Sequence, residues 1–306
     1  MYPVITVPDD AAESTEQLGT KPKFWFRNEI GQRCLFKQGR PGTGENWAEK
    51  VGAELCELLS IPHAHYDLAV WRDQPGVVSP NFVPEDCRLV LGNELLARLV
   101  EGYAQTQYYQ QAGHTLGRVF AVLRAPAVQA PASWTADPVV RSAAHIFVGY
   151  LMLDALIGNT DRHHENWGLI VGSGHAGREA WLAPTFDHAS SLGRNESEQR
   201  MLERMKTRDA QFSVAGYAKR ARSALYRSTR EARPLSTLDA FDNARRRFPK
   251  VALAWLSRFR ELRAESIREI VEQIPSSFIS PTARSFALQV LAANARRLYP
   301  ATEATR

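Results

Sequence analysis

A long apolar run near the middle of the chain constrains the fold more than any other feature. Residues 142–157 are apolar nearly all round a helical wheel, which predicts a helix buried on every side. Such a helix needs packed layers around it, and a chain of 306 residues with 44% hydrophobic side chains can supply them. The run also contains His145 and Asp154, and it is too short and too polar to cross a bilayer.

The segments before this helix have the pattern of a small sheet with one helix. Apolar residues at helical spacing predict a helix over about 47–59, with Asn46 as its N-cap. Turns are predicted at Asn28–Gln32 and Gln74–Gly76, where Gly is available. Alternating apolar and aromatic runs predict strands at 23–27, 33–37, 65–71, 77–78 and 88–91.

Most of the remaining segments have helical periodicity. The predicted helices lie at 94–101, 113–124, 199–207, 236–247, 251–272 and 280–298. Two short strands are predicted at 167–171 and 179–182, and residues 126–138 are expected to form a connecting loop. A β-rich half followed by a larger helical half predicts an α+β fold with two lobes. We expect a β-rich N-lobe over residues 1–93 and a helical C-lobe over residues 94–306.

Polar residues crowd together directly after the apolar helix. Asp161 and Asn166 stand five residues apart, so one loop could present a carboxylate to a hydroxyl and an amide oxygen to a metal ion. Phosphoryl transfer needs both groups. Asp187, which follows Phe186, could supply a second oxygen ligand, and Mg²⁺ favours one or two protein carboxylates together with phosphates and water.

A lysine and two glutamates upstream complete the pattern. Lys37 ends a predicted strand and could reach the phosphates of a nucleotide. Glu49 and Glu54 lie on the helix 47–59, and either could pair with Lys37. The order Lys, Glu, Asp-x₄-Asn, Asp, on a β-rich half followed by a helical half, is the order of the protein-kinase signature.

The sequence resembles a known family in two stretches. Residues 156–166 (LIGNTDRHHEN) and 183–193 (APTFDHASSLG) resemble the HipA-like serine/threonine kinases, the toxin kinases of HipA/HipB-type toxin–antitoxin systems. That family has an N-T-D-R-H-x-x-N catalytic loop and a later F-D metal motif. Residues 46–50 are similar to its early helix, and residues 19–23 to its nucleotide loop, although Lys21 replaces the usual Gln. The resemblance covers residues 14–193 and implies a two-lobed protein-kinase-like fold.

The resemblance implies a role for each candidate site residue. Asp161 would be the catalytic base, and His163 would be a catalytic-loop residue that orients the loop rather than one that transfers a proton. Asn166 and Asp187 would hold Mg²⁺. The residues that bind ATP would be Gly19, Lys23, Lys37 and Glu49, with Lys37 and Glu49 as a lobe-bridging ion pair. The implied activity is transfer of the γ-phosphate of ATP to a protein hydroxyl.

The resemblance also implies partners. A protein substrate and a small DNA-binding antitoxin are expected, because family members commonly pair with one. Family members often carry an autophosphorylated serine before the loop glycine, and Leu18 and Glu16 occupy those positions here. This favours a permanent negative charge at Glu16 over autophosphorylation.

Composition and charge bound the remaining possibilities. Three cysteines without C-x-x-C spacing argue against a disulfide framework, and the N-terminus lacks a signal-peptide pattern. We therefore expect a cytoplasmic protein that has no membrane partner. Residues 1–193 carry 15 Lys+Arg and 21 Asp+Glu, whereas residues 194–306 carry 23 and 12. Without a nucleic-acid motif, this basic third is best explained as a solvated helical surface, and direct nucleic-acid binding is not expected.

Three alternative functions stay open. One is a small-molecule phosphotransferase on the same fold, although such kinases usually carry H-G-D where this chain has Asn159-Thr160-Asp161. Another is a metal-dependent hydrolase, since His63 and His65 would share one face of a strand, although no H-E-x-x-H motif is present. The last is a non-catalytic binding module, in which an intact set of carboxylates would be costly to bury.

Overall fold

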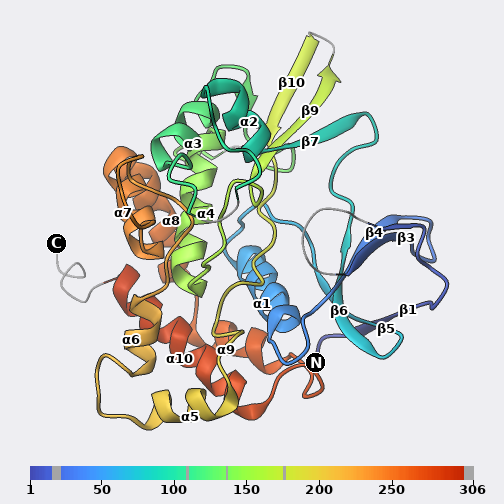
Figure 1. Cartoon of the computed structure of the whole chain (residues 1–306), viewed down its shortest axis with the longest axis vertical. Helices are drawn as coiled ribbons and strands as arrows, with labels where there is room; N and C mark the ends of the chain where they lie inside the picture. The colour runs from blue at the N-terminus through green and yellow to red at the C-terminus, as the bar shows by residue number, and fades with distance from the viewer. Residues whose placement is uncertain (16–21, 108–109, 136, 175–176, 300–306) are drawn as a thin grey trace.

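The computed structural model describes residues 1–15, 22–107, 110–135, 137–174 and 177–299. A six-stranded sheet lies on one side of the molecule and most of the helices lie on the other, with the helix of residues 45–58 between them (Figure 1). This arrangement confirms the predicted α+β fold with a sheet lobe and a helical lobe.

The first sheet forms the β-rich lobe, with strand order β1-β5-β6-β4-β3-β2. Its strands are β1 (Val4–Val7), β2 (Ser14–Thr15), β3 (Lys23–Arg27), β4 (Arg33–Gln38), β5 (Asp67–Trp71) and β6 (Gln74–Pro80). The pair β1–β5 is parallel, and the other pairs are antiparallel. Strand β1 is absent from the sequence prediction because only Val7 of its four residues is buried.

The hairpin of β3 and β4 forms as predicted. Its turn runs through Gly31 at φ +78°, and the Asn28 side chain accepts a hydrogen bond from the Gln32 amide at 2.8 Å. Alternation along the strands buries Phe24 and Phe36 on one face. The opposite face carries Lys23 and Lys37, which are direct cross-strand partners. The hairpin therefore presents two lysines side by side on the face away from its aromatic core.

The predicted turn at Gln74–Gly76 is wrong, because these residues begin strand β6. The hairpin of β5 and β6 turns at Arg72 and Asp73 instead, both with positive φ (49° and 60°), as a two-residue type I′ turn requires. The glycine has another role there. A Cβ on Gly76 would lie 2.5 Å from the Lys37 carbonyl oxygen, so this position needs glycine for close strand packing.

Helix α1 (Glu45–Leu58) connects the first sheet to the rest of the molecule. Val51 and Leu55 are completely buried, as the predicted periodicity requires. The prediction of Asn46 as N-cap is wrong, because Gly44 occupies the cap position without a side-chain hydrogen bond and Asn46 lies buried in the first turn. Helix α1 packs against β5 and β6 on one side and against helices of the other lobe on the other.

Strand β7 (Cys87–Leu91) leads directly into helix α2 (Gly92–Leu99). Strand β7 belongs to a second sheet with the order β7-β9-β10-β8, formed with β8 (Val128–Gln129), β9 (Gly168–Gly174) and β10 (Gly177–Leu182). A Cβ on Gly92 would lie 2.3 Å from the Trp167 ring, so only glycine fits this junction. The N-lobe boundary expected after residue 93 falls in the first turn of α2 and stays a prediction.

Helix α4 (Ala143–Ile157) is the buried helix that the sequence predicts. Ser142 caps it by accepting a hydrogen bond from the His145 amide, and the helix interior is almost fully buried. Gly149 allows the ring of Trp255 to pack closely, since a Cβ there would lie 2.6 Å from the indole. The surrounding helices include α3 (Leu116–Leu123), α7 (Thr237–Arg247), α8 (Pro249–Glu261) and α10 (Pro281–Leu298).

The C-terminal helices differ from the prediction in two places. The single helix predicted over 251–272 is wrong: α8 ends at Glu261, and α9 (Ala264–Glu272) begins after two residues with extended backbone, Leu262 and Arg263. Helix α6 (Val214–Lys219) was not predicted, because six residues are too few to establish a helical period. Helix α5 (Glu198–Lys206) agrees with the prediction within one residue.

The N-terminal segment contacts the C-terminal helices. The Tyr2 amide donates a hydrogen bond to the carbonyl of Gln273 at the end of α9 (2.8 Å), and Figure 1 shows the N-terminus beside this helix. Within the described residues, no helix combines the length and apolar character that crossing a bilayer demands.

Candidate active site

The loop after α4 begins with a left-handed glycine. Gly158 has φ +67° and ψ +41°, a conformation in which glycine avoids the steric cost that other residues meet. Asn159 follows and is completely buried. Its amide nitrogen donates to the Asp154 carboxylate (2.8 Å), and its oxygen accepts from the Asp161 amide (3.0 Å). This pair of bonds turns the chain so that Asp161 comes directly after the end of the helix.

A buried ion pair fixes the rest of the loop. Arg162 donates two hydrogen bonds of 2.8 Å to the two carboxylate oxygens of Asp154, and neither side chain is more than 2% exposed. A third nitrogen of Arg162 donates to the Asn166 carbonyl (2.7 Å) and to the Phe186 carbonyl (3.5 Å). Arg162 therefore ties the helix, the loop and the segment before Asp187 together, a role that the sequence analysis did not assign to it or to Asp154.

Asp161 lies at the centre of the candidate site. Its carboxylate accepts a hydrogen bond from the Ser190 hydroxyl (3.2 Å), and the Nε2 atom of His163 lies 3.8 Å from its other oxygen. Burial raises the pKa of Asp161, His163 acts against this, and the Asp187 carboxylate raises the pKa further. The structure thus brings Asp161 and Asp187 close enough to interact electrostatically.

Asp187 has an unusual backbone. Its φ is +60°, a left-handed conformation that Asp tolerates better than most residues, and its amide donates to the Tyr66 hydroxyl (3.3 Å). The Asp187 carboxylate lies 3.9 Å from Lys37 Nζ. Burial alone would lower the pKa of Lys37, but Asp187, Tyr66 and Glu49 together raise it above its usual value. Lys37 is therefore a fixed cation beside a carboxylate.

The ion pair expected between Lys37 and Glu49 is replaced by the pair of Lys37 with Asp187 in the described part of the chain. Glu49 Oε1 instead accepts a hydrogen bond from the His188 amide (2.6 Å) and lies 3.4 Å from its Nδ1. Glu49 is near enough to Lys37 to raise the pKa of the lysine. The reason for the difference is that Glu49 is nearly fully buried against His188 and anchors the residue after Asp187.

The oxygens of Asn166 and Asp187 could hold a metal ion. The amide nitrogen of Asn166 donates to the Asp161 carbonyl (2.7 Å), which leaves its side-chain oxygen as the acceptor atom. Asp187 adds a partly exposed carboxylate. One carboxylate and one amide oxygen suit Mg²⁺, which takes its other ligands from phosphates and water. In the described residues, no three His, Cys, Asp or Glu side chains gather as a protein-only metal site would need.

The remaining loop residues support the site. His163 Nδ1 accepts a hydrogen bond from the Glu165 amide (3.1 Å), so Nε2 carries the proton and is directed to Asp161. The orienting role of His163 stays a prediction. Glu165 accepts a hydrogen bond from Asn93 (2.9 Å), and Lys23 is close enough to Glu165 to influence its pKa. Lys23 therefore lies over the loop, beside Lys37.

Sequence reasoning missed a second bridge between the lobes. Glu45, at the start of α1, is 2% exposed and pairs with both Arg40 and Arg194. Arg194 also donates to the Ser190 hydroxyl (2.8 Å), which in turn contacts Asp161. The acidic Glu45 in the first turn of a helix was the available sequence signal for this bridge, but its partner Arg194 lies 149 residues further along the chain.

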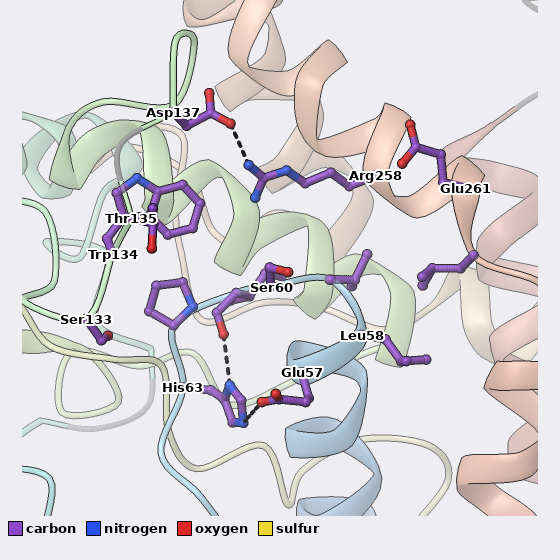
Figure 2. A pocket seen from close by; sticks show the side chains of 14 residues that line it. Glu57, Leu58, Ser60, His63, Ser133, Trp134, Thr135, Asp137, Arg258 and Glu261 are labelled. Carbon is purple, nitrogen blue, oxygen red and sulfur yellow. Dashed lines mark hydrogen bonds and ion pairs between the residues drawn. The ribbon is translucent and has the colours of Figure 1, made fainter.

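Two other sequence expectations have different outcomes. Gly19 lies outside the described residues, so its role stays a prediction. His63 and His65 do not share a strand face, since β5 begins at Asp67, and their rings bond to the Ile61 carbonyl and the Asp67 carboxylate. His63 lines a cavity of about 730 Å³ between the end of α1, residues 133–135 with Asp137, and α8 (Figure 2). That cavity contains none of the predicted catalytic, nucleotide or metal residues that the structure describes.

Known structures share this arrangement. The crystal structure of the Helicobacter pylori proinflammatory kinase CtkA matches with a TM-score of 0.71 and 17% identity, over 97% of this chain and 98% of that one. This chain has a protein-kinase-like fold. The HipA toxin of Shewanella oneidensis MR-1, solved with HipB and operator DNA, matches with a TM-score of 0.53 and 15% identity, over 95% of this chain and 66% of that one. No family model and no curated protein matches the sequence, so the similarity lies in the fold.

Proposed function

We propose that the protein is a Mg²⁺- and ATP-dependent serine/threonine protein kinase. The observation that carries the proposal is the convergence of Asp161, Asp187 and Lys37: the Asp187 carboxylate lies 3.9 Å from Lys37 Nζ and raises the pKa values of both Lys37 and Asp161. Asn166 joins them through its bond to the Asp161 carbonyl. A fixed cation, a carboxylate with a raised pKa and two hard oxygen donors are the groups that phosphoryl transfer uses.

Each residue has one task in this reaction. Asp161 accepts the proton of the substrate hydroxyl. As it does so, the hydroxyl oxygen of the substrate forms a bond to the γ-phosphorus of ATP, and the bond between that phosphorus and the bridging oxygen breaks, which releases ADP. Lys23 and Lys37 bind the phosphates. Asn166 and Asp187 would hold Mg²⁺, which when bound neutralises charge on the phosphate oxygens. His163 and Ser190 orient the Asp161 carboxylate by contacting its two oxygens.

A protein partner belongs to the proposal as well. The HipA neighbour was solved in complex with HipB and operator DNA, and this supports an antitoxin-like partner for the present chain. The present chain spans 66% of that neighbour's length. Co-purification of the tagged protein from its native host, followed by identification of bound proteins, tests this part separately from the chemistry.

The test of the chemistry is transfer of labelled phosphate from ATP to protein or peptide hydroxyls. Asp161→Asn should lower the rate by about 10²- to 10⁴-fold, since it removes a general base. Asp86→Asn, an exposed aspartate outside the site, is the matched control and should keep the rate. Omitting Mg²⁺ should abolish transfer. Phosphate transfer that survives both Asp161→Asn and the removal of Mg²⁺ would overturn the proposal.

A further inference from the structure

A second, smaller cavity lies next to Ser190, which contacts the proposed catalytic base. Its volume is about 280 Å³, and its lining comes from the end of α4, residues 190–196 and helix α6. Ser190 lines it and donates to the Asp161 carboxylate. Lys37, Asn166 and Asp187 are not among its lining residues. Ser190 therefore separates the cavity from the residue that would accept the hydroxyl proton by a single hydrogen bond, and the cavity does not include the residues that would hold the nucleotide and metal.

The charge of this cavity is positive. Arg194, Arg204 and Arg220 line it, and Glu196 is the acidic residue of its lining. Arg204 pairs with Glu196 (2.6 Å), and Arg194 pairs with Glu45 from outside the lining. Arg220 bonds to the Gln211 carbonyl and, within the described residues, has no carboxylate within ion-pair distance. A guanidinium group at the cavity is thus left to pair with an anion from outside the chain.

The hydroxyl of Tyr217 adds a directional donor. Burial raises the pKa of Tyr217 to about 12, with Glu196 adding to the effect, so the hydroxyl keeps its proton at neutral pH. Its ring is held by an edge contact with Phe286, with 5.3 Å between ring centroids. The Arg204 guanidinium lies over the Tyr217 ring, 5.1 Å from its centroid, and Arg194 and Arg220 line the same cavity.

We propose that this cavity binds the carboxylate of an acidic residue that flanks the phosphorylated hydroxyl in a protein substrate. The inference rests on the proposed function. Arg194 and Asp161 both contact the Ser190 hydroxyl, at 2.8 and 3.2 Å. Because an extended chain advances about 3.3 Å per residue, a side chain one to three positions from the acceptor can reach the arginines. The substrate class is therefore a serine- or threonine-containing segment with a nearby Asp or Glu.

Degenerate peptide arrays, with one fixed residue at each position around a central serine or threonine, test this inference. The full-length protein with Mg²⁺ and labelled ATP should prefer Asp or Glu at one flanking position. In Arg220→Gln, the ratio of kcat/KM for the acidic over the neutral peptide should fall about threefold to fivefold, as expected for a partly exposed charge pair. Arg220→Glu should favour Lys or Arg at the same position. Lys219→Gln removes the same charge from an exposed neighbour outside the lining and should keep the ratio.

Two results would overturn the inference while leaving the proposed function intact. One is phosphate transfer without any acidic preference, and the other is an acidic preference that survives in both Arg220 variants. Failure of transfer to every peptide and protein is a different outcome, since it would remove the proposed function itself. Circular dichroism melts of each variant show whether it is folded, and Tyr217→Phe provides a second variant, for which the acidic-to-neutral ratio should also fall.

Discussion

At the residue scale, one buried ion pair orders the loop that follows α4. Arg162 satisfies both oxygens of Asp154 and also bonds to two carbonyls on either side of the site. Burying two charges is costly, and the cost is offset only when the hydrogen bonds are as complete as they are here. The pair therefore contributes order to the loop more than net stability.

Removing one member of this pair should be strongly destabilising. In Asp154→Ala, Arg162 becomes a buried charge without its carboxylate, which costs about 3–5 kcal/mol of unfolding free energy. Urea denaturation at pH 7 measures the loss. The exposed pair Arg268–Glu272 supplies the control, because Glu272→Ala should cost less than about 1 kcal/mol. A loss for Asp154→Ala as small as that of the control would show that the loop does not depend on the pair.

His114 makes the stability of the protein depend on pH. Its ring is 1% exposed; Nε2 accepts from the Trp167 indole (3.0 Å) and Nδ1 donates to the Ala224 carbonyl (3.1 Å). Burial, aided by His164, lowers the pKa of His114 to about 3. Between that value and the unfolded pKa of about 6.5, the unfolded chain holds a proton that the folded protein lacks. Stability from this residue is thus present above pH 6.5 and lost as the pH falls.

The slope expected from one such proton is about 1.4 kcal/mol per pH unit. In His114→Gln, the free energy of unfolding should be lower at pH 7 but should decline less steeply from pH 6 to pH 4. Urea midpoints at several pH values measure this. His65→Gln is the contrasting variant. Hydrogen bonding to Asp67 raises the pKa of His65, so removing this histidine should not make the decline of the unfolding free energy from pH 6 to pH 4 less steep. Equal slopes for the wild type and His114→Gln would contradict the assignment.

At the element scale, the sequence predicted the segments whose signal is local. The buried helix α4, the hairpin of β3 and β4, and the loop with Asp161 and Asn166 follow from apolar periodicity, turn residues and motif spacing. The pairing of Glu49 with His188, and of Glu45 with Arg194, depends on contacts between residues more than 130 positions apart. No local pattern specifies such contacts, so the sequence could name candidate site residues but not several of the partners that hold them.

Gly158 links helix α4 to the catalytic loop and should not tolerate a side chain. With φ at +67°, Gly158→Ala should lower stability by about 1–2 kcal/mol through backbone strain. Gly117, inside helix α3, is the opposite case. A Cβ added at this position would have its nearest neighbouring atom 3.7 Å away, so an alanine side chain fits there. Gly117→Ala should raise stability by up to about 1 kcal/mol. Thermal melts of the two variants should move in opposite directions, and a shift in the same direction would refute the conformational argument.

At the scale of the whole molecule, the candidate site depends on both lobes. Lys23 and Lys37 come from the first sheet, whereas Asp161, Asn166 and Asp187 come from the helical lobe and its loops. A ligand that contacts both sets binds only the folded protein and should stabilise it. Sequence patterns predicted the two halves, and the relative placement of the halves came from the packing of α1 between them.

Mg²⁺ with a non-hydrolysable ATP analogue should therefore raise the free energy of unfolding. At one hundred times the dissociation constant the gain is about 2.7 kcal/mol. In Lys37→Met and Asp187→Asn most of this gain should disappear at the same ligand concentration, while Lys250→Met, an exposed lysine on α8, should retain it. Urea midpoints with and without ligand measure the effect. Undiminished gains in both site variants would place the nucleotide elsewhere.

The bond from Tyr2 to the end of α9 has a mechanical consequence. The chain passes from the first sheet to the second between Pro80 and Cys87, and the hydrogen bond from the Tyr2 amide to the Gln273 carbonyl adds a non-covalent tie between the start of the chain and the end of α9. Any motion that carries the first residues of the chain away from α9 must break this hydrogen bond. Because β1 pairs with β5, that restraint is passed on to the first sheet.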